Sequence, residues 1–127
     1  MTAPETSFDH TDTAWHRICS MSDLECGWGE AAWVAGRQIA IVKVSDEAVY
    51  AVDQQCPATG AFVMARGIVG NRGSAATIAS PLHKEVYLLE TGECPADPDL
   101  YLSTYPVRIE DGVVLVELDD AQIEAAA

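Results

Sequence analysis

The stretches Gln55-Cys56-Pro57-Ala58-Thr59-Gly60 and Ser80-Pro81-Leu82-His83-Lys84 decide how this chain folds. Each reads as a proline-containing loop, and each carries one side chain of a type that binds transition metals, a cysteine in the first and a histidine in the second. The neighbouring positions Ala58 and Ser80 supply no comparable ligand, because alanine has no donor atom and a serine hydroxyl has far too high a pKa to replace a thiolate. The sequence therefore places two potential metal ligands, Cys56 and His83, in two proline-containing loops.

The spacing of these positions resembles that of a Rieske [2Fe–2S] centre. Such a centre takes two Cys thiolates on one iron and two His imidazoles on the other, presented as Cys-x-His in one loop and Cys-x-x-His in a second. The corresponding residues here are Cys56, Ala58, Ser80 and His83, so each iron would keep a single protein ligand. Because a metal site gains its stability from several deprotonated ligands acting together, we expect no metal site and no [2Fe–2S] cluster in this chain.

The rest of the chain is patterned as short strands. Apolar runs and period-two alternation dominate, long helical periods are almost absent, and the runs end at turn residues, as is typical of a β-sandwich or small barrel. Strands are expected over Trp15–Met21, Glu30–Val34, Arg37–Val44, Ala48–Asp53, Ala75–Ala79, Glu85–Leu89, Val107–Ile109 and Val113–Glu117. The last two are joined through Glu110-Asp111-Gly112, and Asp-Gly readily adopts the positive φ values of a tight hairpin turn.

A chain of 127 residues is one ordinary domain. We expect an all-β, Rieske-like antiparallel β-sandwich or small barrel over residues 14–118, with two long loops at one end. Residues 1–13 are expected to form a disordered N-terminal tail, and residues 119–127 a C-terminal tail or short helix.

An ordered series of short motifs makes the resemblance specific to one family of Rieske-like proteins. The series spans about residues 15 to 117 and consists of Gln38-Ile39-Ala40, Val49-Tyr50-Ala51-Val52, Thr59-Gly60-Ala61, Arg66-Gly67-Ile68-Val69-Gly70, Ala79-Ser80-Pro81-Leu82, Thr91-Gly92-Glu93-Cys94 and Tyr105-Pro106-Val107-Arg108. In this order the motifs resemble the small subunit of assimilatory NAD(P)H-dependent nitrite reductase, a family that is Rieske-like in fold but generally lacks the full ligand set.

The resemblance implies a role in nitrate and nitrite assimilation, where the reductase converts nitrite to ammonium. It implies a non-catalytic accessory subunit with no cofactor of its own. The siroheme, the [4Fe–4S] cluster, the FAD and the NAD(P)H site would belong to a large catalytic subunit, which is the expected partner. Whether such a subunit regulates, assembles or stabilises the large one stays open at this point.

Composition excludes several classes of partner. The chain has 7 basic and 20 acidic residues and a net charge of −13, which repels nucleic acid and anionic membrane surfaces. No apolar run approaches the length of a membrane span, and the N-terminus has no signal-peptide layout, so a cytoplasmic protein is expected. The remaining cysteines, Cys19, Cys26 and Cys94, are expected to be free thiols, and the resemblance places them away from the end that carries the two loops.

The charges are unevenly distributed, which indicates a docking surface. Residues 54–84 contain no Asp or Glu but include Arg66, Arg72 and Lys84. Together with four further residues they form the expected docking set for the large subunit: Phe62, Met64, Pro81 and His83. The acidic termini alone account for much of the opposite charge, so a chance distribution is the alternative. The tryptophans Trp15, Trp28 and Trp33 are interpreted as core or strand-face aromatics rather than a binding platform.

Two other functions remain open from the sequence. One is a Rieske-type [2Fe–2S] ferredoxin that carries electrons to an oxygenase or reductase. The other is a free-standing domain that binds a single metal ion or a small ligand through Cys56 and His83.

Overall fold

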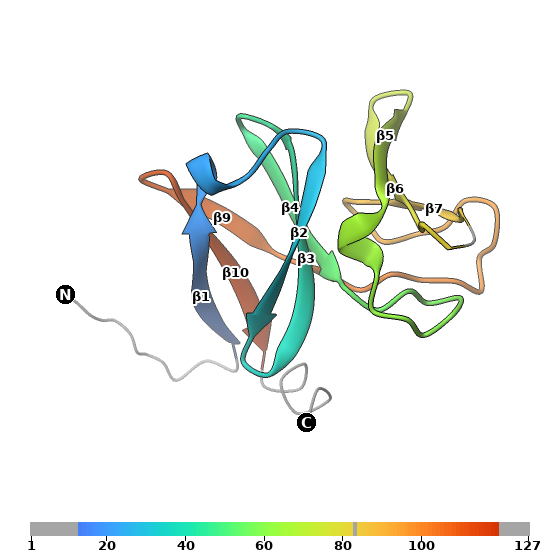
Figure 1. Cartoon of the computed structure of the whole chain (residues 1–127), viewed down its shortest axis with the longest axis horizontal. Helices are drawn as coiled ribbons and strands as arrows, with labels where there is room; N and C mark the ends of the chain where they lie inside the picture. Colours follow the sequence, from blue (N-terminus) through green and yellow to red (C-terminus); the bar gives the residue numbers. More distant parts are fainter. Residues whose placement is uncertain (1–12, 83, 120–127) are drawn as a thin grey trace.

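The computed structural model describes residues 13–82 and 84–119, and its strands form three antiparallel sheets. Figure 1 shows the first sheet on the left, the second in the middle and the third on the right. The all-β architecture predicted from the sequence is confirmed as a stack of open sheets, so the sandwich describes it better than the closed barrel. The two expected tails fall largely outside the described residues.

The first sheet joins the two ends of the domain. It has the order β1 (Thr13–Ser20), β10 (Val113–Asp119), β9 (Val107–Glu110). Strands β1 and β10 pair from Thr13 with Asp119 to Ser20 with Val113, so each strand runs one residue into an expected tail. The predicted hairpin is also present: Asp111 and Gly112 have φ values of 53° and 76° and connect β9 to β10.

The second sheet is the middle layer. Its order is β2 (Trp28–Val34), β3 (Arg37–Ser45), β4 (Ala48–Asp53), β8 (Thr104–Tyr105). In β3 the consecutive residues Ile39, Ala40, Ile41 and Val42 are all fully buried. Consecutive residues of a strand point to opposite faces, so this strand is covered on both sides, which explains why it reads as an unbroken apolar run rather than an alternating one.

The third sheet belongs to a lobe that we define as residues 54–82 and 84–103. It contains the short helix η3 (Met64–Arg66) and the strands β5 (Ile68–Arg72), β6 (Ala75–Ala79) and β7 (Val86–Leu88). The lobe lies to the right of the second sheet in Figure 1. No strand was predicted for β5, because its Gly-Asn-Arg end is polar and exposed; it forms through pairing with β6.

Two apolar clusters hold the three layers together. The first lies between the first and second sheets and includes Ile39, Ile41, Val114 and Val116. The second lies between the second sheet and the lobe, and its members are Ala40, Val42, Val52, Cys56, Met64, Ile78, Tyr87, Leu89, Cys94 and Leu102. The middle sheet is therefore the shared support, and it fixes the position of both proline loops.

Candidate functional site

The two proline loops meet at Cys56 and Ser80. The Cys56 Sγ lies 3.3 Å from the Ser80 Oγ, and both residues are fully buried. Each loop is closed by its own backbone: the N–H of Cys56 donates to the carbonyl of Ala61 at 2.7 Å, and the N–H of Lys84 donates to the carbonyl of Ser80 at 2.9 Å. The expected meeting of the loops is confirmed by this direct contact.

The residues at this meeting point do not fit a Rieske cluster. Cys56 and Ser80 stand at the two positions that would share one iron, but Ser80 offers a hydroxyl in direct contact with Cys56 instead of a second thiolate. Ala58 is exposed on the loop and has no donor atom. The fourth position, His83, lies outside the described residues. The donor set therefore supplies at most one thiolate where two are needed.

The Cys56 thiol is held by hydrogen bonds instead. Burial raises its pKa, but donors around the sulfur outweigh burial and hold the pKa below the usual value for a thiol: the hydroxyls of Ser80 and Thr59 and the backbone N–H groups of Thr59 and Ala58. Hydrogen bonds to the charged form of a group favour that form. Hydrogen-bond donors from both proline loops thus favour the thiolate form of Cys56.

We expect Ser80→Ala to raise the pKa of Cys56, because the change removes the largest of the hydrogen bonds that lower it. The pKa is lower in the folded state, so ionised Cys56 stabilises the fold above the pKa of the unfolded thiol, and this stabilisation is lost as the pH falls through the folded pKa. As the pH rises from the folded pKa of Cys56 to its unfolded pKa, the free energy of unfolding of the wild type should therefore increase relative to that of Ser80→Ala. Ultraviolet titration of the thiolate, with Cys56→Ala as the blank, would measure the shift; equal titration curves would contradict it.

Cys94 lies closer to this site than the sequence indicated. Cys94 is buried in the same apolar cluster as Cys56, together with Tyr87. Burial raises the pKa of Tyr87, and the nearby charges of Cys56 and then Cys94 raise it further. The expectation that all three other cysteines lie away from the loop end is therefore wrong for Cys94. Its turn folds back on the lobe, since the N–H of Leu102 donates to the carbonyl of Gly92 at 2.8 Å.

The expected docking residues separate into exposed and buried ones. Arg66, Arg72 and Lys84 are exposed, Phe62 is half-exposed, and Pro81 is partly buried. Met64 is fully buried, so its place in the docking set is wrong. It opens η3, and its side chain packs into the cluster beneath the loop. His83 lies outside the described residues.

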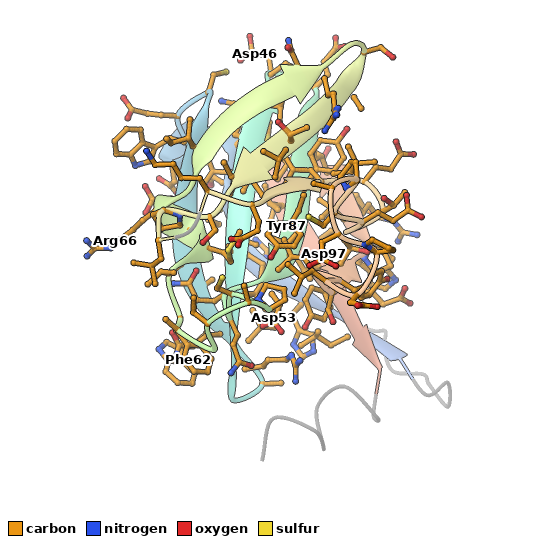
Figure 2. The ribbon with its side chains drawn as sticks, turned by 90° about the vertical axis from the view of Figure 1, so that its right-hand side faces the viewer. Asp46, Asp53, Phe62, Arg66, Tyr87 and Asp97 are labelled. Atoms are coloured by element: carbon orange, nitrogen blue, oxygen red, sulfur yellow. The ribbon has the colours of Figure 1, made fainter. Side chains whose placement is uncertain are left out.

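The lobe as a whole is not basic. Residues 85–99 pack in the same lobe and add five acids, namely Glu85, Glu90, Glu93, Asp97 and Asp99, which exceed the three basic residues of 54–84. The absence of acids from residues 54–84 was expected to leave the loop end neutral to basic, and the five acids of residues 85–99 show that this is wrong for the lobe as a whole. Figure 2 shows Arg66 and Phe62 along the left edge, directed away from the ribbon, and Asp97 to the right of Tyr87. The acid-free surface is confined to one side of the lobe.

Two aromatic residues beside that surface were missed as functional candidates. Trp28 and Trp33 lie on β2 and are 59% and 72% exposed, so they are strand-face aromatics, as one half of the interpretation held, but not core residues. Trp15 differs, because the Arg108 guanidinium stacks over its ring at 4.5 Å. The sequence did offer a signal for Trp28 and Trp33: each is a tryptophan in an edge strand whose apolar residues do not alternate regularly with polar ones.

Comparison with known proteins identifies the family. A family model described as Rieske-like [2Fe-2S] domain matches residues 14–117. The chain belongs to this family. Within it, the nitrite reductase (NADH) small subunit of Salmonella typhimurium is 33% identical over 101 residues, covering 79% of this chain and 94% of the relative. A crystal structure from Mycobacterium tuberculosis, described as an NADH-dependent nitrite reductase small subunit, superposes with a TM-score of 0.80 at 35% identity, over 84% of this chain and 96% of that one.

Two other relatives bear on function. The nitrite reductase [NAD(P)H] large subunit of Klebsiella oxytoca is 32% identical over 102 residues, covering 80% of this chain but 11% of that much longer protein. A 3-phenylpropionate/cinnamic acid dioxygenase ferredoxin subunit from Shigella flexneri is 38% identical over 88 residues, covering 66% of this chain and 76% of the relative. The same domain thus occurs as a separate small subunit, as part of a large one and as a ferredoxin.

Proposed function

We propose that this chain is the small accessory subunit of an NAD(P)H-dependent nitrite reductase, which reduces nitrite to ammonium in the cytoplasm. Two relatives point in different directions, a reductase subunit and an electron carrier. The observation that favours the reductase subunit is the Cys56–Ser80 contact. A Rieske ferredoxin needs both thiolates for its cluster, whereas an accessory subunit needs only the fold.

The proposal assigns the chemistry to the large subunit. Among the residues that the structure describes, no group of three or more His, Cys, Asp and Glu side chains is placed to hold a metal ion, and no helix is long and apolar enough to cross a membrane. The siroheme, the [4Fe–4S] cluster, the FAD and the NAD(P)H site would all lie on the partner. This chain would contribute a binding surface and no catalytic residue.

The test is co-expression with the large subunit followed by purification through a tag on this chain. The proposal expects a stoichiometric complex that carries siroheme and flavin, and a separately purified small subunit with neither iron nor labile sulfide. A stoichiometric cluster in the isolated chain, seen by visible absorption and electron paramagnetic resonance after anaerobic purification, would establish the ferredoxin function instead. Iron bound without labile sulfide, and lost in Cys56→Ala, would favour a single-metal site.

Charge reversal should weaken the complex through its association rate. We expect the combined change of Arg66, Arg72 and Lys84 to Glu to slow association by about tenfold at low salt, because charges at an interface rim steer the encounter of the partners. Surface plasmon resonance at several salt concentrations would measure this, since the difference should shrink as salt screens it.

Arg17→Glu supplies the matched control for that experiment. Arg17 is exposed but lies on β1, in the sheet farthest from the lobe. An equal loss per reversed charge from Arg17→Glu would show that only net charge matters, and an unchanged rate in the triple variant would rule out the basic residues of the lobe as part of the interface.

A further inference from the structure

Three exposed aromatic side chains border the acid-free side of the lobe. Trp28 and Trp33 stand near the two ends of β2, and Phe62, which is 50% exposed, stands on the first proline loop. We call Trp28, Trp33 and Phe62 the aromatic triad. Large exposed aromatics are costly to hydrate, and Trp in particular is enriched among the residues that contribute most to protein–protein binding.

Phe62 separates two hollows that the tryptophans close on either side. The first hollow, of about 290 Å³, is lined by Phe62, Trp33 and Arg37 together with Gln38, Asp53 and Gln55. The second, of about 650 Å³, is lined by Phe62, Trp28 and Arg66, among others. A ridge between two hollows can receive two side chains of a partner, one on each side of the Phe62 ring.

The loop that carries Phe62 is fixed firmly to the second sheet. The side chain of Gln54 accepts a hydrogen bond from the N–H of Ala65 at 2.7 Å, and the carbonyl of Gln54 accepts one from Met64 at 3.0 Å. η3 also packs directly on β2: a Cβ on Gly29 would lie 2.5 Å from the carbonyl oxygen of Ala65. The backbone that carries the triad is therefore held in place before any partner arrives, which reduces the entropic cost of binding.

The charges around the triad indicate which kind of partner binds there. Arg37 is already engaged, with Asp53 at 3.4 Å and with the Tyr105 hydroxyl at 2.6 Å. Arg66 projects beside Phe62 at the rim of the larger hollow, which Glu30 also lines. A second copy of this chain would bring another charge of −13 against the first, and such repulsion opposes self-association. An occupant with apolar side chains and a carboxylate near Arg66 suits the surface better.

We propose that the aromatic triad is the anchor through which this chain binds the large nitrite reductase subunit, whose interface segment places one apolar side chain in each hollow and a carboxylate against Arg66. This inference rests on the proposed function and adds β2 to the docking surface. The large subunit is chosen as the partner because, in the long relative from Klebsiella oxytoca, a domain like this one is part of a polypeptide named as the large subunit.

The test measures the dissociation constant of the complex between the purified large subunit and variants of this chain. We expect Trp28→Ala, Trp33→Ala and Phe62→Ala each to weaken binding by about tenfold or more, mainly through faster dissociation. Tyr101→Ala is the matched control. Tyr101 is 58% exposed, close to the exposure of Trp28, but it lies on the loop that carries the lobe's acids, so its loss should leave the constant unchanged.

A second measurement on the wild-type complex avoids any effect of substitution on folding. Hydroxyl-radical footprinting should show Trp28, Trp33 and Phe62 protected by the large subunit and Tyr101 as reactive as in the free chain. Binding that survives all three substitutions, or a triad that stays reactive in the complex, would overturn the inference while leaving the proposed function intact.

Two further outcomes distinguish a failure of this inference from a failure of the proposed function. A wild-type chain that does not bind the large subunit at all would overturn both the proposed function and the inference. Sedimentation of the isolated chain provides the remaining outcome: a dimer that the triad substitutions dissociate would assign this surface to a second copy of the chain, against the inference.

Discussion

The double substitution Ala58→His and Ser80→Cys is expected to give this chain a Rieske-type [2Fe–2S] cluster, whereas the wild type, with one ligand for each iron, is expected to bind none. The two loops already meet where the first iron would sit, since Cys56 Sγ and Ser80 Oγ are 3.3 Å apart. A thiolate introduced at position 80 would therefore complete the pair with Cys56. An imidazole introduced at position 58 would join His83 on the second iron, following the pattern Cys-x-His and Cys-x-x-His. Two ligands on each iron restore the chelate that the natural sequence lacks.

The measurement is iron and labile sulfide content after anaerobic reconstitution, with visible absorption and electron paramagnetic resonance as the spectroscopic readouts. The double variant should bind about two irons and two sulfides per chain, as this cluster type requires. Ala58→His alone and Ser80→Cys alone are the matched controls, and each should bind far less, because one iron would still have a single ligand. A wild type that takes up a full cluster under the same conditions would contradict the ligand count on which the prediction rests.

The sequence predicted the strands well wherever local pattern and tertiary burial agree. Ala48–Asp53 and Ala75–Ala79 were predicted with the bounds that the structure has, and the Asp111-Gly112 turn forms the predicted hairpin. β5 was missed because its polar end depends on pairing with β6, and the two residues of β8 because they pair with β4 across a long sequence separation. No local pattern encodes the β4–β8 pairing, whereas β5 and β6 are joined by the two-residue turn Gly73-Ser74, a local hairpin signal that the prediction overlooked.

The site was harder to predict than the fold, because it depends on which side chains the loops turn inward. Met64 has the same apolar character as Phe62, two residues earlier, yet one is buried and the other half-exposed. The charge prediction failed for a related reason. Residues 85–99 follow the acid-free stretch in sequence, but they pack in the same lobe and bring five acids there. Both errors come from assigning a surface by sequence segment instead of by packing.

Gly92→Ala is expected to be the most destabilising single methyl addition among the described glycines. Gly92 has a φ of +83°, and a Cβ there would overlap the carbonyl oxygen of Leu102 and lie 3.3 Å from Thr104 Cγ2. The left-handed backbone costs a non-glycine residue about 1–2 kcal/mol, and forced overlap in a packed interior costs about 1–3 kcal/mol more. We therefore expect the free energy of unfolding to fall by about 3 kcal/mol, a large part of the stability of an ordinary domain.

Urea denaturation would measure the loss, and Gly73→Ala separates its two causes. Gly73 also has a positive φ, +64°, but a Cβ there would meet nothing within 4 Å, so its substitution should cost only the backbone term of about 1–2 kcal/mol. Gly92 also accepts the hydrogen bond from Leu102 that folds residues 93–101 back onto the lobe. Moving Leu102 to make room would disturb the cluster that contains Cys56 and Cys94. Equal losses from the two substitutions would mean that this loop can shift to accommodate the methyl group, and that the close contact between Gly92 and Leu102 adds nothing to the cost.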